Sequence, residues 1–306
     1  MSPVFWLKIT DWKKQSAQKI PINTDDPYKL FSNFIKSFCW TMDNMVGTRS
    51  IVSRIMNTPF EINKDIERKW IIKAEIIEEN CIYLYYDRDD KPNNITDKMA
   101  KQYELLKRYL FVNHPVNRKV ISTFNEMFGQ EFYFNRKKGN FFYSTEIPGV
   151  ISDQEITNNE QLTSVEYIYF DIFEDGEFSE DVINYNPIWW SKAALTKAKQ
   201  CILASYDKVN DCLKEIYKFN IDKFDDKTKY ENLWSPDAAW NFLNDFLNFV
   251  EYSVFSVSSD IRKKCVWKFQ SYPNDEPFVS CEILIRNVVN DQETLTPITV
   301  NETNFP

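Results

Sequence analysis

Apolar residues recur along the chain with two different spacings, which predict a mixture of strands and helices. Short runs rich in β-branched and aromatic residues are typical of strands, and apolar residues three or four apart are typical of helices. The predicted strands cover residues 4–9, 70–77, 81–86, 131–134, 140–147, 165–173, 265–270 and 278–285. The predicted helices cover residues 27–40, 97–112 and 187–203, and a further helix begins at Ser235.

The helix that begins at Ser235 carries the clearest start signal. Ser235 is a favourable N-cap, Pro236 fits the first helical position, and Asp237 complements the helix dipole. A broad apolar stripe follows, so we expect this helix to be buried on one side. The stripe consists of Trp240, Leu243, Leu247 and Val250, with Phe242, Phe246 and Phe249 beside it.

Strands and helices alternate irregularly, and the chain contains no internal repeat and no low-complexity linker. This order favours an α+β protein over a regular β-α-β fold. We therefore expect residues 1–306 to form a single domain, with residues 1–44 as an N-terminal lead-in packed on it.

The composition indicates a large core and excludes several chemistries. Of the 306 residues, 43% are hydrophobic and 16% are aromatic, which is not typical of a disordered chain. With only 5 glycines, the sequence has neither a dinucleotide-binding G-x-G-x-x-G motif nor a P-loop. The single histidine, His114, excludes zinc sites built on several histidines and is expected to be a helix-stop residue before Pro115.

Cysteine spacing and hydropathy indicate the cellular environment. The six cysteines are far apart and form no C-x-x-C pair, as expected for buried reduced thiols. The N-terminus has no signal-peptide core, and no stretch is apolar enough to span a membrane. We therefore expect an intracellular protein that is not secreted and has no membrane partner.

The charge of the chain is unevenly distributed. A net charge of −8 argues against non-specific coating of nucleic acid, which needs clustered Lys and Arg. Residues 101–138 carry eight basic and three acidic residues, whereas residues 139–191 carry eleven acidic residues and no Lys or Arg. Two interpretations stay open: a solvated acidic loop beside a basic helix face, or a metal site or protein-docking surface beside a basic RNA groove.

Several short segments occur in an order that a known family shares. They are residues 48–61 (W-R-G-x-x-T-K-I-x-x-x-P-Y-D/E in the family), 104–113 (E-L-x-x-x-G-Y-K-F-E), 143–148 (F-S-G-E-V-D), 167–172 (Y-V-E-L-K-T), 188–193 (K-W-W-x-Q-S), 234–236 (W-N-P) and 246–249 (F-L-x-F). With these segments the chain resembles the DXO family of RNA 5′-end decapping enzymes and exoribonucleases.

The resemblance covers residues 45–285 and implies a fold and an activity. The implied fold is one α+β domain with two mixed, largely antiparallel β-sheets flanked by helices. In active members several carboxylates and a lysine surround Mg²⁺ or Mn²⁺, which are hard cations that prefer oxygen ligands. The metal generates the hydroxide that attacks the 5′-terminal linkage.

This chain departs from the family at most of those positions. Arg49 and Glu146 match the family, and Lys192 replaces the glutamine of W-W-x-Q-S. The Glu146 carboxylate and the Asn113 amide alone would leave a cation largely water-ligated and weakly held. The remaining replacements are Asn113 for a glutamate, Pro148 for an aspartate, and Tyr169 and Asp171 for the glutamate and lysine of E-L-K.

The resemblance therefore implies a catalytically degenerate, Cutoff-like member that binds RNA 5′ ends, a protein partner, or both. We expect no catalytic residue, no metal and no DNA partner, and a nuclear or nucleocytoplasmic location. The acidic region 139–191 is the expected docking surface for a protein partner. The candidate RNA-binding residues are Arg49, Arg54, Lys107, Arg108 and Lys192.

Two alternatives stay open. In the first, Asp171, Glu174 and Asp175, which lie close together in sequence, rebuild a metal site. Glu146 and Asp171 then bind Mg²⁺ or Mn²⁺ in an active decapping enzyme and 5′→3′ exoribonuclease. The other alternative is a globular interaction protein with no RNA role. For Trp189 and Trp190, core packing is the expected role.

Overall fold

The structure is a computed structural model that describes part of the chain. The described residues are 4–5, 45–60, 70–77, 81–86, 101–103, 105–106, 110, 132–135, 140–144, 149–151, 165–175, 186–223, 234–272, 278–289 and 292–297. The predicted helix over residues 27–40 lies outside them.

The chain forms two compact units, each assembled from three separate segments. Unit 1 comprises Met1–Pro27, Asn93–Glu131 and Ser144–Ser235. Unit 2 comprises Tyr28–Pro92, Phe132–Tyr143 and Pro236–Pro306. The single-domain organisation expected from the sequence stays a prediction.

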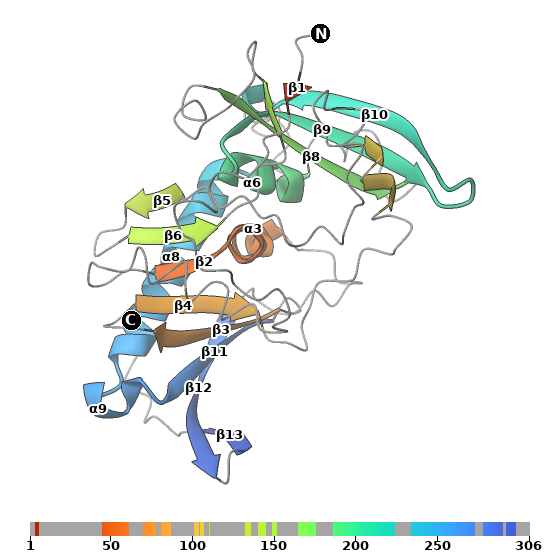
Figure 1. Ribbon diagram of the computed structural model, residues 1–306. Coiled ribbons are helices and arrows are strands. Elements are labelled where there is room, and N and C mark those ends of the chain that lie inside the picture. Colours follow the sequence, from red (N-terminus) through yellow and green to blue (C-terminus); the bar gives the residue numbers. More distant parts are fainter. Residues whose placement is uncertain are drawn as a thin grey trace, which may run out of the picture. The chain divides into compact units, whose positions relative to one another are not determined.

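Unit 1 contains a five-stranded sheet with the order β1-β7-β8-β9-β10 (Figure 1). Strands β8 and β9 are parallel, and helix α6 connects them, because a parallel pair needs a long crossover. The other pairs are antiparallel. The elements are β1 (Val4–Phe5), β7 (Gly149–Ile151), β8 (Glu166–Glu174), α6 (Pro187–Leu195), β9 (Ala198–Asp207), β10 (Cys212–Asn220) and the 3₁₀ turn η6 (Ile221–Lys223).

The helix predicted over residues 187–203 is wrong in its second half. Helix α6 ends at Leu195, and Lys197 adopts a left-handed conformation with φ of 52° before β9 begins at Ala198. The Ala, Leu and Lys residues favour a helix, but every residue from Cys201 to Tyr206 is buried. Pairing with β8 and β10 on both sides overrides the local preference.

Unit 2 contains an eight-stranded sheet with the order β13-β12-β11-β3-β4-β2-β6-β5. The β2–β4 pair is parallel, and the pairs around β3, β11 and β12 are antiparallel. The strands are β2 (Met45–Thr48), β3 (Ile71–Ile77), β4 (Cys81–Tyr86), β5 (Phe132–Asn135), β6 (Asn140–Ser144), β11 (Cys265–Tyr272), β12 (Phe278–Val289) and β13 (Gln292–Pro297). The helical elements are α3 (Arg49–Asn57), η1 (Thr58–Phe60), α8 (Pro236–Phe255) and α9 (Ser259–Arg262).

Helix α8 packs its apolar stripe in the core of unit 2, as predicted. Leu243, Leu247 and Val250 are buried, and Phe246 makes edge-to-face contacts with Trp70 and Phe269 at centroid distances of 5.7 and 5.5 Å. Trp267 is fully buried and donates its indole N–H to the Ser253 carbonyl at 3.0 Å.

The described structure confirms most predicted strands, with ends that differ by a few residues. The described residues between 101 and 110 are helical, as predicted for residues 97–112. Strands β2, β7, β9, β10 and β13 were not predicted. Together the two mixed sheets and their helices confirm the expected α+β fold class.

The described cysteines match the expectation of buried thiols only in part. All five are free, but only Cys81, Cys201 and Cys265 are buried; Cys281 is half-buried and Cys212 is exposed. Burial raises the pKa of the Cys281 thiol to about 12, so this thiol stays protonated. Among the described helices, none has the length and apolarity needed to cross a membrane.

Candidate functional site

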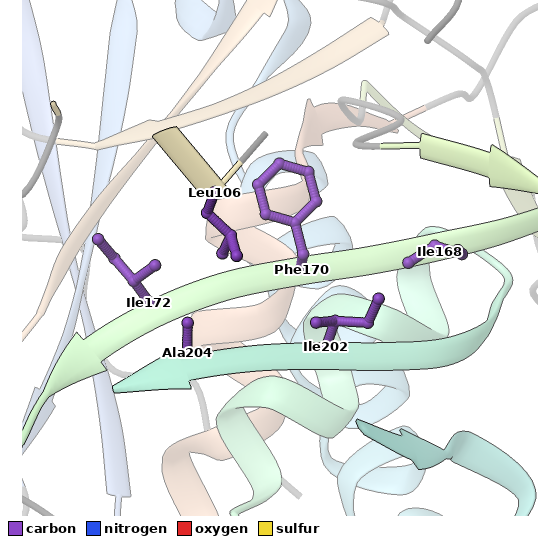
Figure 2. Packing of buried hydrophobic residues seen from close by; sticks show 6 residues of the cluster. All are labelled: Leu106, Ile168, Phe170, Ile172, Ile202 and Ala204. Atoms are coloured by element: carbon purple, nitrogen blue, oxygen red, sulfur yellow. The ribbon is translucent and has the colours of Figure 1, made fainter. Parts of the chain in front are cut away.

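Strand β8 has two different faces, because successive side chains of a strand point to opposite sides. Its apolar face packs against Leu106 and against Ile202 and Ala204 of β9 (Figure 2). Tyr103 stacks on the same cluster, 4.8 Å from the ring of Phe170. Ile168, Phe170 and Ile172 form this face, so Tyr169 and Asp171 lie on the other one.

Helix α6 lies over that second face of β8 and is fixed by its own sequence. Asn186 caps it by accepting a hydrogen bond from the Ile188 N–H at 2.9 Å, and Pro187 occupies its first turn. Trp189 is buried against Phe173 of β8, with ring centroids 5.3 Å apart. Lys192 follows three residues later on the same side of the helix, so it faces β8 as well.

Asp171 is the centre of a small polar cluster between β8 and α6. Its Oδ2 atom accepts a hydrogen bond from the Tyr169 hydroxyl at 2.5 Å and lies 3.1 Å from Lys192 Nζ. Its Oδ1 atom accepts from the Ile172 N–H at 3.0 Å. The side chains of Asp171 and Lys192 keep only 21% and 32% of their surface exposed. The carboxylate is therefore held by three donors in a mostly buried position.

The surroundings of Asp171 favour its ionised form. Burial by itself raises the pKa of Asp171, but Lys192, the Tyr169 hydroxyl and the Ile172 N–H together outweigh burial and hold the pKa below its usual value. The neighbouring Cys201 lies opposite Tyr169 in the β8–β9 register, and the pKa of its thiol shifts in the opposite direction. Burial and then the Asp171 charge raise the pKa of its thiol well above the usual range, so it is not a reactive thiolate.

We expect the stabilisation provided by Asp171 to depend on pH. Because the folded-state pKa lies below the unfolded value of about 3.9, the contribution is complete above that value and is lost as the pH falls through the folded pKa. Urea unfolding of the protein and of Asp171→Asn at pH 7, 5 and 3 should show a stability difference that shrinks at pH 3. A difference that stays constant would contradict this. Glu166→Gln, which removes an exposed ion pair with Lys199, is the matched control and should have little effect at any pH.

The structure brings together two positions at which the charge departs from the family pattern. The resemblance places a lysine where Asp171 stands and a glutamine where Lys192 stands. The 3.1 Å ion pair between these side chains shows that the two replacements are spatial partners. In this chain the lysine of the pair stands on helix α6 and the carboxylate on strand β8.

The other described carboxylates of β8 do not converge with Asp171. Glu174 pairs with Lys208 at 2.9 Å, and Asp175 pairs with Lys214 at 2.8 Å. Within the part of the chain that the structure describes, no three His, Cys, Asp or Glu side chains form a group that could hold a metal ion. These described carboxylates therefore do not fit a relocated Mg²⁺ or Mn²⁺ site.

Two of the candidate RNA-binding residues lie in unit 2. Arg49 begins helix α3, and Arg54 lies in its last turn; both are half-buried. Burial raises the pKa of Tyr143 on β6, and the positive charge of Arg49 partly opposes that shift, so the guanidinium and the phenol are electrostatic neighbours. The candidates Lys107, Arg108, Asn113, Glu146 and Pro148 lie outside the described residues.

Trp189 and Trp190 are core residues, as expected. Each keeps 5% of its surface exposed, and Trp190 packs against Trp234 with ring centroids 5.1 Å apart. Cys201 and the β9 strand beneath the Asp171 cluster were not found from the sequence. The apolar run from Cys201 to Ala204 was the available signal, but the helix-forming residues before it obscured the strand.

Comparison with known proteins identifies the fold. No family model matches the chain, and no curated protein sequence matches it significantly. Solved structures do match. Rai1 of S. pombe, crystallised with 3′-FADP, matches with a TM-score of 0.61 and 12% identity over 87% of this chain and 80% of that chain.

Two further structures extend this likeness to other yeasts. Candida albicans Rai1 in complex with pU5 and Mn²⁺ matches with a TM-score of 0.54 and 13% identity, over 90% of this chain and 76% of that chain. K. lactis Dxo1 in complex with manganese matches with a TM-score of 0.55 and 9% identity, over 100% of this chain and 85% of that chain. The chain has the fold of the Rai1 and Dxo1 proteins, which confirms the fold implied by the DXO resemblance.

Proposed function

We propose that this chain is a catalytically inactive DXO-like protein that binds RNA 5′ ends without hydrolysing them. The observation that carries this proposal is the Asp171–Lys192 ion pair with its Tyr169 hydrogen bond. Tyr169, Asp171 and Lys192 occupy the positions at which the resemblance places a glutamate, a lysine and a glutamine of the active site.

The chemistry of the replacements supports the loss of hydrolysis. The Tyr169 hydroxyl donates a hydrogen bond to Asp171, so Tyr169 offers a neutral phenol where the family has a carboxylate. Asp171 is occupied by three donors, and its negative charge stands where a lysine would face the substrate phosphate. Asn113 and Pro148 replace two further carboxylates. Hard divalent cations need several oxygen ligands, and the residues at these positions supply too few.

The RNA part of the proposal rests on the shared fold. Candida albicans Rai1 was crystallised with pU5 and Mn²⁺. We propose that the present chain binds RNA 5′ ends and that Arg49, Arg54, Lys107, Arg108 and Lys192 contribute to this binding. Its role would be to occupy RNA 5′ ends in the nucleus and thereby restrain decapping, termination or decay.

A protein partner that docks on region 139–191 belongs to the same proposal. In the described part of this region, Glu166, Asp171, Glu174 and Asp175 each pair with a lysine. Docking on this part would therefore depend more on shape and apolar contact than on net negative charge.

We expect no metal-dependent turnover of RNA 5′ ends. The purified protein would be incubated with Mg²⁺ or Mn²⁺ and with 5′-triphosphate, incompletely capped and 5′-monophosphate RNAs, and the products separated by gel electrophoresis. S. pombe Rai1 tested in parallel shows whether the assay detects activity. Turnover that disappears in Glu146→Ala would refute the inactive assignment and favour the alternative, an active decapping enzyme that binds its metal with Glu146 and Asp171.

Binding is tested separately from turnover. Fluorescence anisotropy of a 3′-labelled RNA with a free 5′ end, near physiological salt, should show binding that Arg49→Glu weakens. Lys263→Glu, which makes the same charge change at an exposed residue at the end of α9, is the control and should bind normally. Equal binding by both variants would argue against an Arg49 contact, and no binding by the unmodified protein would favour an interaction protein without an RNA role.

A further inference from the structure

Strand β10 presents an exposed edge on unit 1. It is the last strand of its sheet among the described strands, with β9 on its inner side. Most of its nine residues are exposed, and Ile216 keeps 45% of its surface in solvent. The outer edge of such a strand carries N–H and C=O groups that can pair with another strand.

A β-bulge interrupts β10 at its centre. Leu213 pairs with Tyr206 and Ile216 pairs with Ala204, so two residues of β10 lie opposite the single residue Ser205. The Glu215 N–H donates to Ser205 Oγ at 3.1 Å. Since Ala204 and Tyr206 share one face of β9, Leu213 and Ile216 also share one face, whereas residues three apart in a regular strand lie on opposite faces.

Leu213 and Ile216 border a shallow apolar hollow beside the described helical residues 101–103 and 105–106. Leu105 forms its other wall and is 41% exposed. Gln102 ties this helix to the hairpin, because its Nε2 atom donates to the Asp211 carbonyl at 2.8 Å. The hollow and the edge strand therefore form one surface with exposed aliphatic side chains.

We propose that two copies of this chain associate by antiparallel pairing of their β10 strands, around a two-fold axis that passes between Lys214 and Glu215. The charges along β10 are self-complementary in this register. Lys214, which also pairs with Asp175 of its own chain, lies opposite the partner's Glu215, and Asp211 lies opposite the partner's Lys218. Each pair occurs twice, so all four charged positions meet an opposite charge, which stabilises cross-strand pairs.

The bulge is what makes this register possible. A two-fold axis perpendicular to the sheet keeps each side chain on its own face, so paired residues must come from the same face. Leu213 then lies opposite the partner's Ile216, and the bulge has placed both on the face of the hollow. Both β10 strands carry the extra residue of the bulge next to the two-fold axis. The residue pairs on either side of the axis therefore stay aligned. The association covers Leu105 and Ile216 of both copies.

The mass of the full chain in solution tests the association. Sedimentation equilibrium over a range of concentrations should give a dimer. Glu215→Lys places two lysines opposite each other at both sites and should raise the dimer dissociation constant by about 10- to 30-fold. Lys214→Glu combined with Glu215→Lys restores opposite charges and should restore the dimer. Asp245→Lys, an equal charge change on the exposed side of α8, should leave it unchanged. Circular dichroism of each variant checks folding.

The register is tested by a single cysteine. Cys212 lies opposite the partner's Tyr217, so Tyr217→Cys should give a disulfide-linked dimer on mild oxidation that disappears when Cys212→Ser is added. Lys218→Cys, one position out of register, should not crosslink through Cys212. A monomer at every concentration would overturn the association. A dimer whose dissociation constant is unchanged by Glu215→Lys, and which forms no crosslink in Tyr217→Cys, would overturn this interface.

Discussion

Replacing Trp189 with alanine is expected to lower the free energy of unfolding by about 3–5 kcal/mol, the usual cost of truncating a buried aromatic residue. Trp189 keeps 5% of its surface exposed and packs against Phe173 of β8. It therefore joins α6 to the strand that carries Asp171. Urea unfolding followed by circular dichroism measures the loss.

The neighbouring Ile188→Ala is the control for Trp189→Ala. Ile188 is only half-buried, and its N–H bond to Asn186 survives the change. We expect a clearly smaller loss of stability for this variant. Similar losses for both variants would contradict the assignment of Trp189 as the main contact between α6 and β8.

Replacing Asp171 with lysine is expected to lower the free energy of unfolding by about 2 kcal/mol or more. The change brings two ammonium groups together at a mostly buried position and removes the acceptor of the Tyr169 hydroxyl. Loss of one partner from a fully buried ion pair costs about 3–5 kcal/mol. About a fifth of the Asp171 side-chain surface and a third of the Lys192 side-chain surface are exposed. The expected loss of stability is therefore smaller than for a fully buried pair.

A second change should recover much of that loss. In Asp171→Lys combined with Lys192→Gln, a single lysine again faces a neutral amide, as in the motif pattern that the chain resembles. A double-mutant cycle with Lys192→Gln alone gives the coupling energy between the two positions. Simple additivity of the two single changes would contradict the interpretation that one replacement compensates for the other.

Much of the fold could be predicted from the sequence because many elements carry local signals. Helix α8 begins at Pro236 as its cap and first-turn residues indicate, and its apolar stripe is buried. Strands β3 and β4 follow from short apolar runs bounded by polar residues. Such signals are properties of a few neighbouring residues, so they need no knowledge of the partner strands.

The errors fall where long-range pairing decides the structure. Residues 198–203 contain good helix formers and still form a strand, because β8 and β10 provide hydrogen-bond partners on both sides. Strand β10 has little apolar periodicity because it is mostly exposed and bulged. Its assignment depends on β9, which the sequence did not reveal.

The sequence by itself determined which residues replace the family's charged positions, since Tyr169, Asp171 and Lys192 are visible in a motif comparison. Only the tertiary structure decided that Asp171 and Lys192 are partners, because they lie 21 positions apart on a strand and a helix. It also decided that Glu174 and Asp175 pair with other lysines instead of joining Asp171. The physical reason is that charge identity is local to a residue, whereas the partner of a charge depends on how the sheet and its crossover helix pack.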